Sequence, residues 1–414
     1  MTGSSVNTER LLARLSELGS TGRDDTGRLV RLAATNADKL GRDRLVGWMQ
    51  DAGLEIAVDR IGNIFGIWTP PGADSSVKPL MVGSHIDTVI NAGIFDGCYG
   101  VLAGLEVIET LMESGVTPKR PIAVGAFTNE EGVRYAPDMM GSLVYSGGLG
   151  IEEALATVGT DGSTLGAELA RIGYAGTHEP GFLQPHAYLE LHIEQGPVLE
   201  REGASIGAVE NLQGISWQKV TIEGDANHAG TTPISMRRDA GLAAARIITF
   251  LRERAHASNT PTVATVGCIE FEPNAINVIP SKATLTIDLR DPDEERLLTE
   301  EKALADYIRK LAIDERVTIS TERLARFQPV TFDSGIVDRI EKAAGMRGLR
   351  SRRMTSGAGH DAQMIARIAP SAMIFVPSIG GISHNPKEHT PDIDLVAGAN
   401  ILLDVVRELT TSED

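Results

Sequence analysis

Residues 83–97 read GSHIDTVINAGIFDG, a stretch in which an apolar run ends in polar residues and a glycine-flanked loop follows. It holds His85, Asp87 and Asp96, with apolar residues on both sides of each polar group. A core strand is rich in Val and Ile, whereas a surface loop carries scattered charge. The pattern therefore indicates polar side chains in a buried site.

Strand-like runs elsewhere in the chain repeat this pattern. They read PLMVGSHID (79–87), PIAVGAFTN (121–129), HAYLELHIE (186–194) and SAMIFVPSI (371–379), and helical patterns such as GVLAGLEVIETLMES (100–114) lie between them. Apolar strands that alternate with helices are typical of an α/β domain with a largely buried sheet.

The middle of the chain has a different texture. SWQKVTIEGD (216–225) alternates like a half-buried strand and is followed by a helical run. VATVGCIEF and KATLTIDLRD then form a candidate hairpin before a second helix and strand. The order β-α-β-β-α-β is typical of a ferredoxin-like fold. We expect an α/β domain made of residues 1–211 and 328–414, interrupted by an inserted domain at 212–327.

Side chains of metal-ligand type fall at or after the carboxyl ends of the four strand-like runs, where open α/β sheets place their sites. Imidazoles and carboxylates without thiolates suit Zn²⁺, Mn²⁺ or Co²⁺, and three histidines with two carboxylates suit two ions bridged by one carboxylate. One such histidine alone would be structural, but the coincidence on four strands favours a metal site. The candidates are His85, Asp87, Asp96, Glu130, Glu131, His192, Glu194 and His384.

The composition excludes several classes of function. A formal net charge of −17 argues against binding nucleic acid or an anionic membrane surface. Cys98 and Cys268 lie far apart and form no CxxC motif, which suits a reducing compartment. No apolar run reaches the roughly 18 residues that span a bilayer, and the start of the chain lacks the features of a signal peptide. We expect a cytoplasmic protein.

Seven motifs, in the same order, resemble those of the hydantoinase/carbamoylase amidases within the M20 metallopeptidase-like superfamily, from about residue 60 to the C-terminus. The resemblance implies a mixed-sheet α/β catalytic domain of the metallo-exopeptidase type, with an inserted ferredoxin-like dimerisation (lid) domain. The motifs are GSHIDTV…FDG, TNEEG, ELHIEQGPVLE, NHAGTTP, NAINVIPSKA, SGAGHDA and GISHNP.

The resemblance also implies roles in catalysis. Glu130 matches the general base that takes a proton from the attacking water, and Asp87 matches the carboxylate that orients the His85 imidazole. Which of Glu130 and Glu131 is the ligand rests on the resemblance alone. The implied ligands of two divalent ions (Zn²⁺, or Mn²⁺ or Co²⁺) are His85, Asp96, Glu131, His192 and His384, with Asp96 bridging.

Four further residues match substrate-binding positions of the family. Arg290 and Asn277 match the residues that bind the substrate carboxylate, and Gln195 lies in the HIEQG motif. His228 matches a residue that polarises the scissile carbonyl in the neighbouring subunit, which implies a homodimer with shared active sites. The alternative for Arg290 is a structural ion pair with Asp288 or Asp291.

Three other positions stay open or are set aside. SGAGHDA (356–362) is expected to line the same pocket, without a role for any single residue in it. Cys98 is interpreted as a small residue packed beneath the metal loop, because the ligand set is already complete. His389 lies near His384, but the family's metal histidine is the one in SHNP.

These observations predict a metal-dependent hydrolase that cleaves the C–N bond of a linear ureido (N-carbamoyl) compound bearing a carboxylate. The first choice of substrate is an N-carbamoyl-L-amino acid, which would yield the amino acid, CO₂ and ammonia. Allantoate or β-ureidopropionate is the second choice, and an aminoacylase or dipeptidase activity is the third. A catalytically inert binding protein of the same fold is disfavoured because all five ligands and Glu130 are present.

Overall fold

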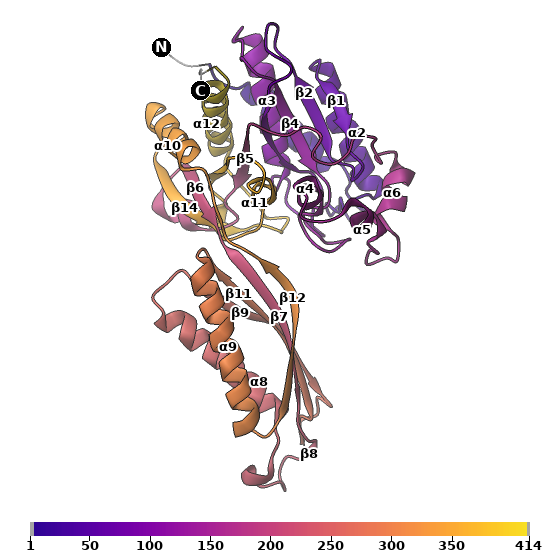
Figure 1. Ribbon diagram of the computed structural model, residues 1–414, viewed down its shortest axis with the longest axis vertical. Helices are drawn as coiled ribbons and strands as arrows, with labels where there is room; N and C mark the ends of the chain where they lie inside the picture. The colour runs from indigo at the N-terminus through magenta and orange to yellow at the C-terminus, as the bar shows by residue number, and fades with distance from the viewer. Residues whose placement is uncertain (1–3, 412–414) are drawn as a thin grey trace. The chain divides into compact units, whose positions relative to one another are not determined.

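The structure is a computed structural model that describes residues 4–411. The chain divides into two compact units, which Figure 1 shows as ribbons. The first unit is formed by residues up to 210 and from 332 onward, and the second by residues 211–331. The second unit spans the segment expected as an insert at 212–327.

A mixed sheet forms the centre of the first unit, with strands in the order β1-β2-β4-β3-β5-β15-β6-β13 and β14 paired to β6. Strands β4, β3, β5 and β15 run parallel to one another, and all their residues are buried. Strands covered on both faces are typically near-continuous apolar runs, as β4 and β15 are, whereas β5 also buries Glu190 and His192. The bounds are β1 Glu55–Val58, β2 Ile64–Trp68, β3 Leu80–His85, β4 Ile122–Phe127, β5 Ala187–Ile193, β6 Ile206–Leu212, β13 Val330–Thr331, β14 Ser351–Ser356 and β15 Ser371–Val376.

Helices cover this sheet. α3 packs on β3 and β5, and α12 packs on β15 and α3 (Figure 1). α3 is apolar on nearly all sides because α1 and α12 lie against it, and Arg10 of α1 forms an ion pair with Glu106 of α3. The helices are α1 Thr8–Ser20, α2 Asn36–Asp51, α3 Cys98–Glu113, α4 Met140–Tyr145, α5 Ile151–Ala156, α6 Leu165–Ile172, α7 Val198–Glu202, α10 Ser334–Met346, α11 Asp361–Ile365, α12 Asp392–Thr411 and the 3-10 turn η2 Ile379–Gly381.

The second unit is a four-stranded antiparallel sheet in the order β12-β7-β11-β9, with α8 and α9 on one face. The elements are β7 Gly214–Glu223, β8 Asn227–His228, η1 Ile234–Met236, α8 Ala240–Ala257, β9 Val263–Glu272, β10 Val278–Ile279, β11 Lys282–Asp291, α9 Glu294–Asp314 and β12 Thr318–Phe327.

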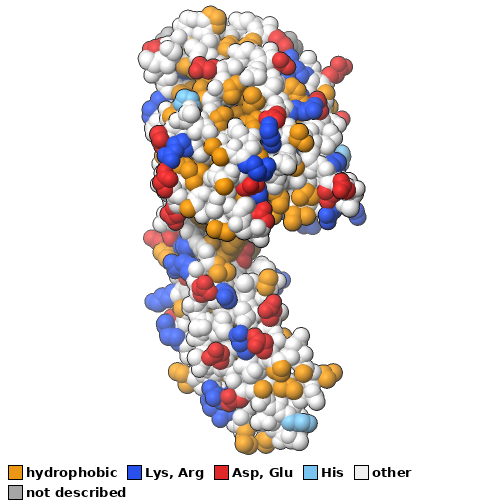
Figure 2. All heavy atoms as spheres, turned by 90° about the vertical axis from the view of Figure 1, so that its right-hand side faces the viewer, with side chains coloured by type: hydrophobic (Ala, Val, Ile, Leu, Met, Phe, Trp, Pro, Cys, Tyr) orange, Lys and Arg blue, Asp and Glu red, His pale blue; other side chains and the backbone are white. Residues whose placement is uncertain are grey.

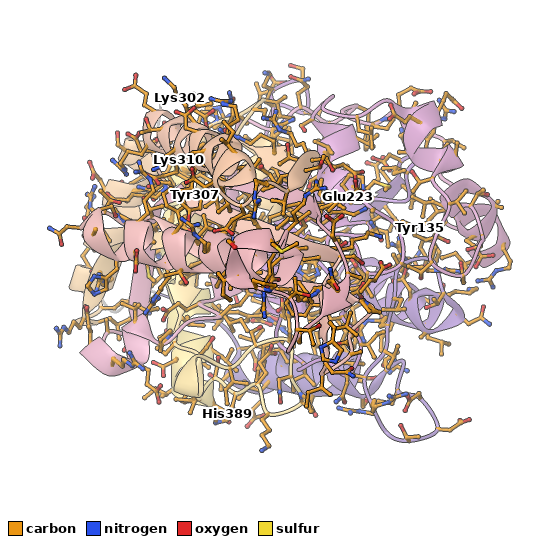
Figure 3. All side chains as sticks on the ribbon, turned by 90° about the horizontal axis from the view of Figure 1, so that it is seen from below. Tyr135, Glu223, Lys302, Tyr307, Lys310 and His389 are labelled. Atoms are coloured by element: carbon orange, nitrogen blue, oxygen red, sulfur yellow. The ribbon has the colours of Figure 1, made fainter. Side chains whose placement is uncertain are left out.

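The core of the second unit lies between this sheet and its two helices. Leu285, Ile287 and Leu289 of β11 are buried there, whereas the residues between them are part-exposed. This alternation explains the half-buried strand pattern, since one face of the sheet meets α8 and α9 and the other does not. The rings of Phe250 on α8 and Tyr307 on α9 stack with their centroids 4.0 Å apart, and Tyr307 is labelled in Figure 3.

The fold class predicted from the sequence is confirmed: a mixed α/β sheet is accompanied by a separate four-stranded antiparallel sheet in the ferredoxin-like order. The short β8–β10 ladder in the second unit is an addition to the predicted elements, because strands of two residues carry no periodic signal. Among residues 4–411, no helix combines the length and the hydropathy needed to cross a bilayer.

Candidate metal centre

The parallel strands bring ligand-type side chains to one edge of the first unit's sheet. His85 is the last residue of β3, and His192 lies near the end of β5. Glu130 and Glu131 follow β4, and His384 lies on the loop after β15. Because parallel strands end at the same edge, side chains from four distant parts of the sequence meet there.

Two groups of possible ligands share Asp96. In the first ligand group, His85 Nε2 and His192 Nε2 lie 3.5 and 3.2 Å from Asp96 Oδ1. In the second ligand group, His384 Nε2 lies 3.3 Å from Asp96 Oδ2 and 3.4 Å from Glu131 Oε2. A carboxylate with one oxygen in each group has the geometry needed to bridge two ions.

The hydrogen bonds of the histidines fit metal binding. Nδ1 of His85 lies 3.0 Å from the carbonyl oxygen of Asp87, and Nδ1 of His192 lies 2.9 Å from that of Ile193. A carbonyl oxygen only accepts, so each Nδ1 carries a hydrogen and each ring turns its Nε2 towards Asp96, which leaves Nε2 as the atom that could bind an ion. Imidazole nitrogens and carboxylate oxygens are the donors that Zn²⁺ and Mn²⁺ accept, and the residues present therefore fit divalent ions.

The electrostatics of the cluster agree with a cation site. Burial raises the pKa of Glu130 well above its ordinary value, and burial with the charge of Asp96 raises the pKa of Glu131 to about 8. The hydrogen bond to Asp96 raises the pKa of His384 to about 9. Buried carboxyl groups that lie close together resist ionisation. A bound cation would stabilise their charged, carboxylate form.

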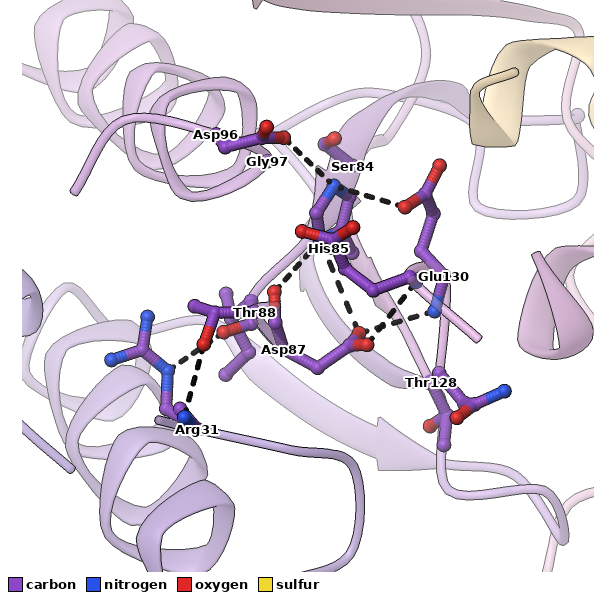
Figure 4. Close-up of polar contacts among 12 residues, drawn as sticks. Arg31, Ser84, His85, Asp87, Thr88, Asp96, Gly97, Thr128 and Glu130 are labelled. Atoms are coloured by element: carbon purple, nitrogen blue, oxygen red, sulfur yellow. Dashed lines mark hydrogen bonds and ion pairs between the residues drawn. The ribbon is translucent and has the colours of Figure 1, made fainter. Parts of the chain in front are cut away.

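Asp87 supports this site differently from the prediction. The resemblance predicts that its carboxylate orients the His85 imidazole, but Oδ1 lies 4.0 Å from His85 Nδ1, whose hydrogen bond goes to the Asp87 carbonyl. The carboxylate instead accepts the backbone N–H groups of Glu130 and Glu131 at 3.1 and 3.3 Å, as Figure 4 shows for Glu130. The side chain of Asp87 therefore holds the loop that carries the two glutamates.

Left-handed backbone explains how two consecutive glutamates reach one site. Asn129 has φ +57° and Gly132 has φ +66°, so the chain turns on both sides of the pair. The Asn129 side chain donates to the carbonyls of Tyr135 and Pro137 at 2.8 and 3.2 Å. The role of Asn129 is one that the sequence analysis missed, and the Asn and Gly of TNEEG are the signal that could have indicated this turn.

Glu130 lies beside the first ligand group without belonging to either group. Its Oε2 is 3.4 Å from His85 Nε2 (Figure 4), and its side chain is largely buried. A carboxylate next to the ligands but outside the set is placed as a general base would be.

Three sequence candidates have other surroundings. Glu194 accepts the N–H groups of Val198 and Leu199, both at 2.8 Å, and so caps α7 rather than joining the ligand groups. His389 is exposed and is labelled in Figure 3. Cys98 is buried, and its sulfur accepts a hydrogen bond from Arg31 at 3.0 Å.

Gln195 and the SGAGHDA segment lie next to the ligands. Gln195 Nε2 donates to Asp96 Oδ2 at 2.8 Å, so this side chain supports the shared carboxylate. The His360 ring of SGAGHDA packs on His192 with centroids 4.6 Å apart. No feature of the sequence distinguishes His360 within its motif, since its place depends on the path of the loop.

The expected substrate residues in the second unit fall into two places. His228 on β8 and Asn277 before β10 are exposed neighbours, joined by a 2.9 Å bond from the Ala229 N–H to the Asn277 carbonyl. β8 and β10 lie beyond the Lys282 end of β11, whereas Arg290 lies near the other end of that strand. Arg290 forms an ion pair with Asp288, with 2.9 Å between Arg290 Nη2 and Asp288 Oδ2. The strand from residue 282 to residue 290 alone spans about 26 Å at roughly 3.3 Å per residue.

The His228 ring is held in one tautomer. Its Nδ1 accepts the N–H groups of Gly230 and Thr231 at 3.0 and 3.2 Å. The neutral ring therefore carries its hydrogen on Nε2, which leaves that atom as a donor.

Comparisons with known proteins place the chain in a family. Residues 81–408 match the model of peptidase family M20/M25/M40. An N-carbamoyl-L-amino-acid amidohydrolase of Rhizobium meliloti is 40% identical over 97% of this chain and 96% of its own length. A ureidoglycolate hydrolase of Arabidopsis thaliana is 36% identical over 96% of this chain and 86% of its own.

A solved structure shows the same fold over the whole length. It is an amidase of the hydantoinase/carbamoylase family from Burkholderia multivorans, with a TM-score of 0.93, 40% identity and coverage of 99% of both chains. With a family model that matches most of the chain and relatives similar throughout, the chain belongs to the M20 peptidase family and, within it, to the hydantoinase/carbamoylase amidases, hydrolases of carbon–nitrogen bonds other than peptide bonds.

Proposed function

We propose that this chain hydrolyses the C–N bond of a linear ureido compound bearing a carboxylate, with an N-carbamoyl-L-amino acid as substrate. The proposal rests on the two ligand groups that share Asp96. Glu130 lies outside both groups, with its Oε2 3.4 Å from His85 Nε2. The similarity to the Rhizobium meliloti amidohydrolase supports the choice of substrate.

The two ligand groups would hold two divalent ions, which would polarise the attacked carbonyl and lower the pKa of the attacking water. Glu130 takes a proton from that water as its oxygen attacks the carbamoyl carbon. Glu130 then passes the proton to the nitrogen on the amino-acid side, and the C–N bond breaks. The products are the amino acid and carbamate, which decomposes to CO₂ and ammonia.

The second unit would supply the substrate contacts. The Arg290 guanidinium fork suits a carboxylate, and its ion pair with Asp288 already holds it on the sheet. His228 Nε2 would donate to the carbonyl oxygen, which gains negative charge as water attacks. Asn277 adjoins His228 and would act with it.

A homodimer with shared active sites would explain why the proposed substrate residues lie at two separate positions in the second unit. Arg290 and His228 lie at opposite ends of the second unit's sheet, about 26 Å apart along β11. A small substrate therefore cannot contact both residues of one chain. We infer that His228 and Asn277 serve the partner's site. Within the described residues β9 pairs with β11 alone, so its outer edge is open to pairing with a second copy.

Exposed apolar side chains support the same conclusion. Ile234, Met236 and Ile276 lie on the segments around His228 and Asn277 and are largely exposed. Hydrophobic side chains gather at this end of the second unit in Figure 2. Such residues are typical of a protein–protein contact.

A substrate panel tests the proposed function. Metal-reconstituted protein is given N-carbamoyl-L-amino acids, allantoate, β-ureidopropionate, ureidoglycolate and dipeptides, and ammonia or amine release is measured. We expect the highest kcat/KM with an N-carbamoyl-L-amino acid. A preference for allantoate or ureidoglycolate would correct the substrate, whereas turnover of dipeptides alone, or of nothing, would contradict the proposal.

Metal removal should abolish turnover. Chelation followed by dialysis leaves the ligand groups empty, and Mn²⁺, Co²⁺ or Zn²⁺ should restore activity because the groups contain no thiolate. Metal analysis and ammonia release on the same samples check this. Full activity in protein without measurable metal would exclude the metal-dependent mechanism.

Arg290→Lys should raise KM for carboxylate substrates by about 10–100-fold, since a charge-assisted bidentate contact is worth about 1.5–3 kcal/mol. Arg326→Lys is the matched control, because Arg326 is also ion-paired, to Glu294 and Glu301. The acid is compared with its neutral amide. Equal damage to both substrates would make Arg290 a structural residue.

A further inference from the structure

The two ligand groups are fixed to the fold in different ways. His85 and His192 lie on buried strands and are oriented by backbone carbonyls. His384 lies on a loop with φ +54°, and its side chain is 52% exposed. The second ligand group therefore depends on how that loop is held.

Glu388 connects this loop to the loop that carries Asp96. It is 7% exposed, and its Oε1 accepts the backbone N–H groups of Phe95 and Asp96 at 2.9 and 3.2 Å. Its Oε2 lies 3.1 Å from the hydroxyl of Ser383, the residue before His384. That hydroxyl also lies 2.9 Å from Asp96 Oδ2.

Gly93 leaves the space that Glu388 occupies. A Cβ on Gly93 would lie 2.2 Å from Glu388 Oε1 and 2.4 Å from its Cβ. The loop before Asp96 is thus shaped around the buried carboxylate.

We infer that Glu388 is a positioning residue that holds the second ligand group together and so sets the affinity for the second ion. The inference rests on the two-ion centre proposed above. Glu388 contacts backbone N–H groups and the Ser383 hydroxyl and belongs to neither ligand group, so it acts through Asp96 and His384. Groups that orient metal ligands typically contribute about 10–100-fold to metal affinity.

The test is a titration of metal-free protein with Mn²⁺, followed by calorimetry and by metal analysis after dialysis. Wild type should bind two ions. Glu388→Gln keeps the size of the side chain but removes its negative charge and leaves one oxygen acceptor where the carboxylate offers two to the Phe95 and Asp96 N–H groups and the Ser383 hydroxyl. We expect the Kd of the first ion to stay within about threefold and that of the second to rise about 10–100-fold, with turnover restored by excess Mn²⁺.

Glu194→Gln is the matched control, since Glu194 is also a buried carboxylate that accepts two backbone N–H groups, but it caps α7. It should bind both ions as wild type does. Unchanged binding by Glu388→Gln, or equal weakening of both ions, would overturn the inference. If wild type binds a single ion, the two-ion centre itself is wrong. The wild-type titration therefore distinguishes a failure of the two-ion centre from a failure of the role inferred for Glu388.

Ser383→Ala provides a second route if Glu388→Gln does not fold. It removes the hydroxyl between Glu388 and Asp96 and leaves the backbone contacts of Glu388 in place. Selective weakening of the second ion supports the inference, and unchanged binding of both ions contradicts it.

Discussion

Glu130→Gln should lower kcat by about 10²–10⁴-fold while the metal content stays as in wild type. Glu130 belongs to neither ligand group, so its loss removes the proton acceptor and leaves the ligands in place. The backbone bond from Glu130 to Asp87 remains, because it does not involve the side chain of Glu130. Kinetics and metal analysis are performed on the same preparation.

Glu131→Gln is the comparison variant. Its side chain belongs to the second ligand group, so this substitution should lower metal content as well as turnover. If Glu130→Gln loses metal and Glu131→Gln keeps it, the roles of the two glutamates are reversed. Near-normal turnover by Glu130→Gln would remove the general base from the mechanism.

His228→Ala should lower kcat by about 10²–10³-fold, because a donor to the developing oxyanion contributes mainly in the transition state. The hydrogen bonds that hold Nδ1 leave Nε2 as the donor. Steady-state kinetics separate this effect on kcat from an effect on KM alone.

Subunit mixing tests the proposal that the protein forms a dimer in which His228 acts on the partner's site. His228→Ala and Glu130→Gln are combined under conditions that allow subunits to exchange. In a mixed dimer one site carries both defects and the other carries neither, so activity should return towards a quarter of wild type. His384→Ala mixed with Glu130→Gln should show no recovery, because both defects lie in the first unit. Exchange without recovery in the first mixture would mean that His228 serves its own subunit.

The fold could be predicted from the sequence because hydrophobic period and strand order are local properties. The runs at 79–87, 121–129, 186–194 and 371–379 become β3, β4, β5 and β15, and the segment near 212–327 has the ferredoxin-like order. Ligand-type residues at the ends of parallel strands meet for a topological reason, so their convergence could be expected.

Contacts within loops could not be predicted in the same way. The backbone carbonyl of Asp87 accepts a hydrogen bond from His85, and its carboxylate accepts one from the backbone of Glu130. Glu194 caps the helix α7. These choices depend on left-handed residues and on the path of each loop, which have no periodic signal. Glu388 is also hidden in sequence, because its partners are backbone amides nearly three hundred residues away.

We propose that metal-loaded protein cleaves the C–N bond of a ureido compound. The most direct measurement follows the amino acid, CO₂ and ammonia together as Mn²⁺-reconstituted protein consumes an N-carbamoyl-L-amino acid. We predict equal amounts of the three products and a rate that falls to background after chelation. No consumption of any N-carbamoyl substrate by the metal-loaded protein, or equal rates with and without metal, would contradict this claim.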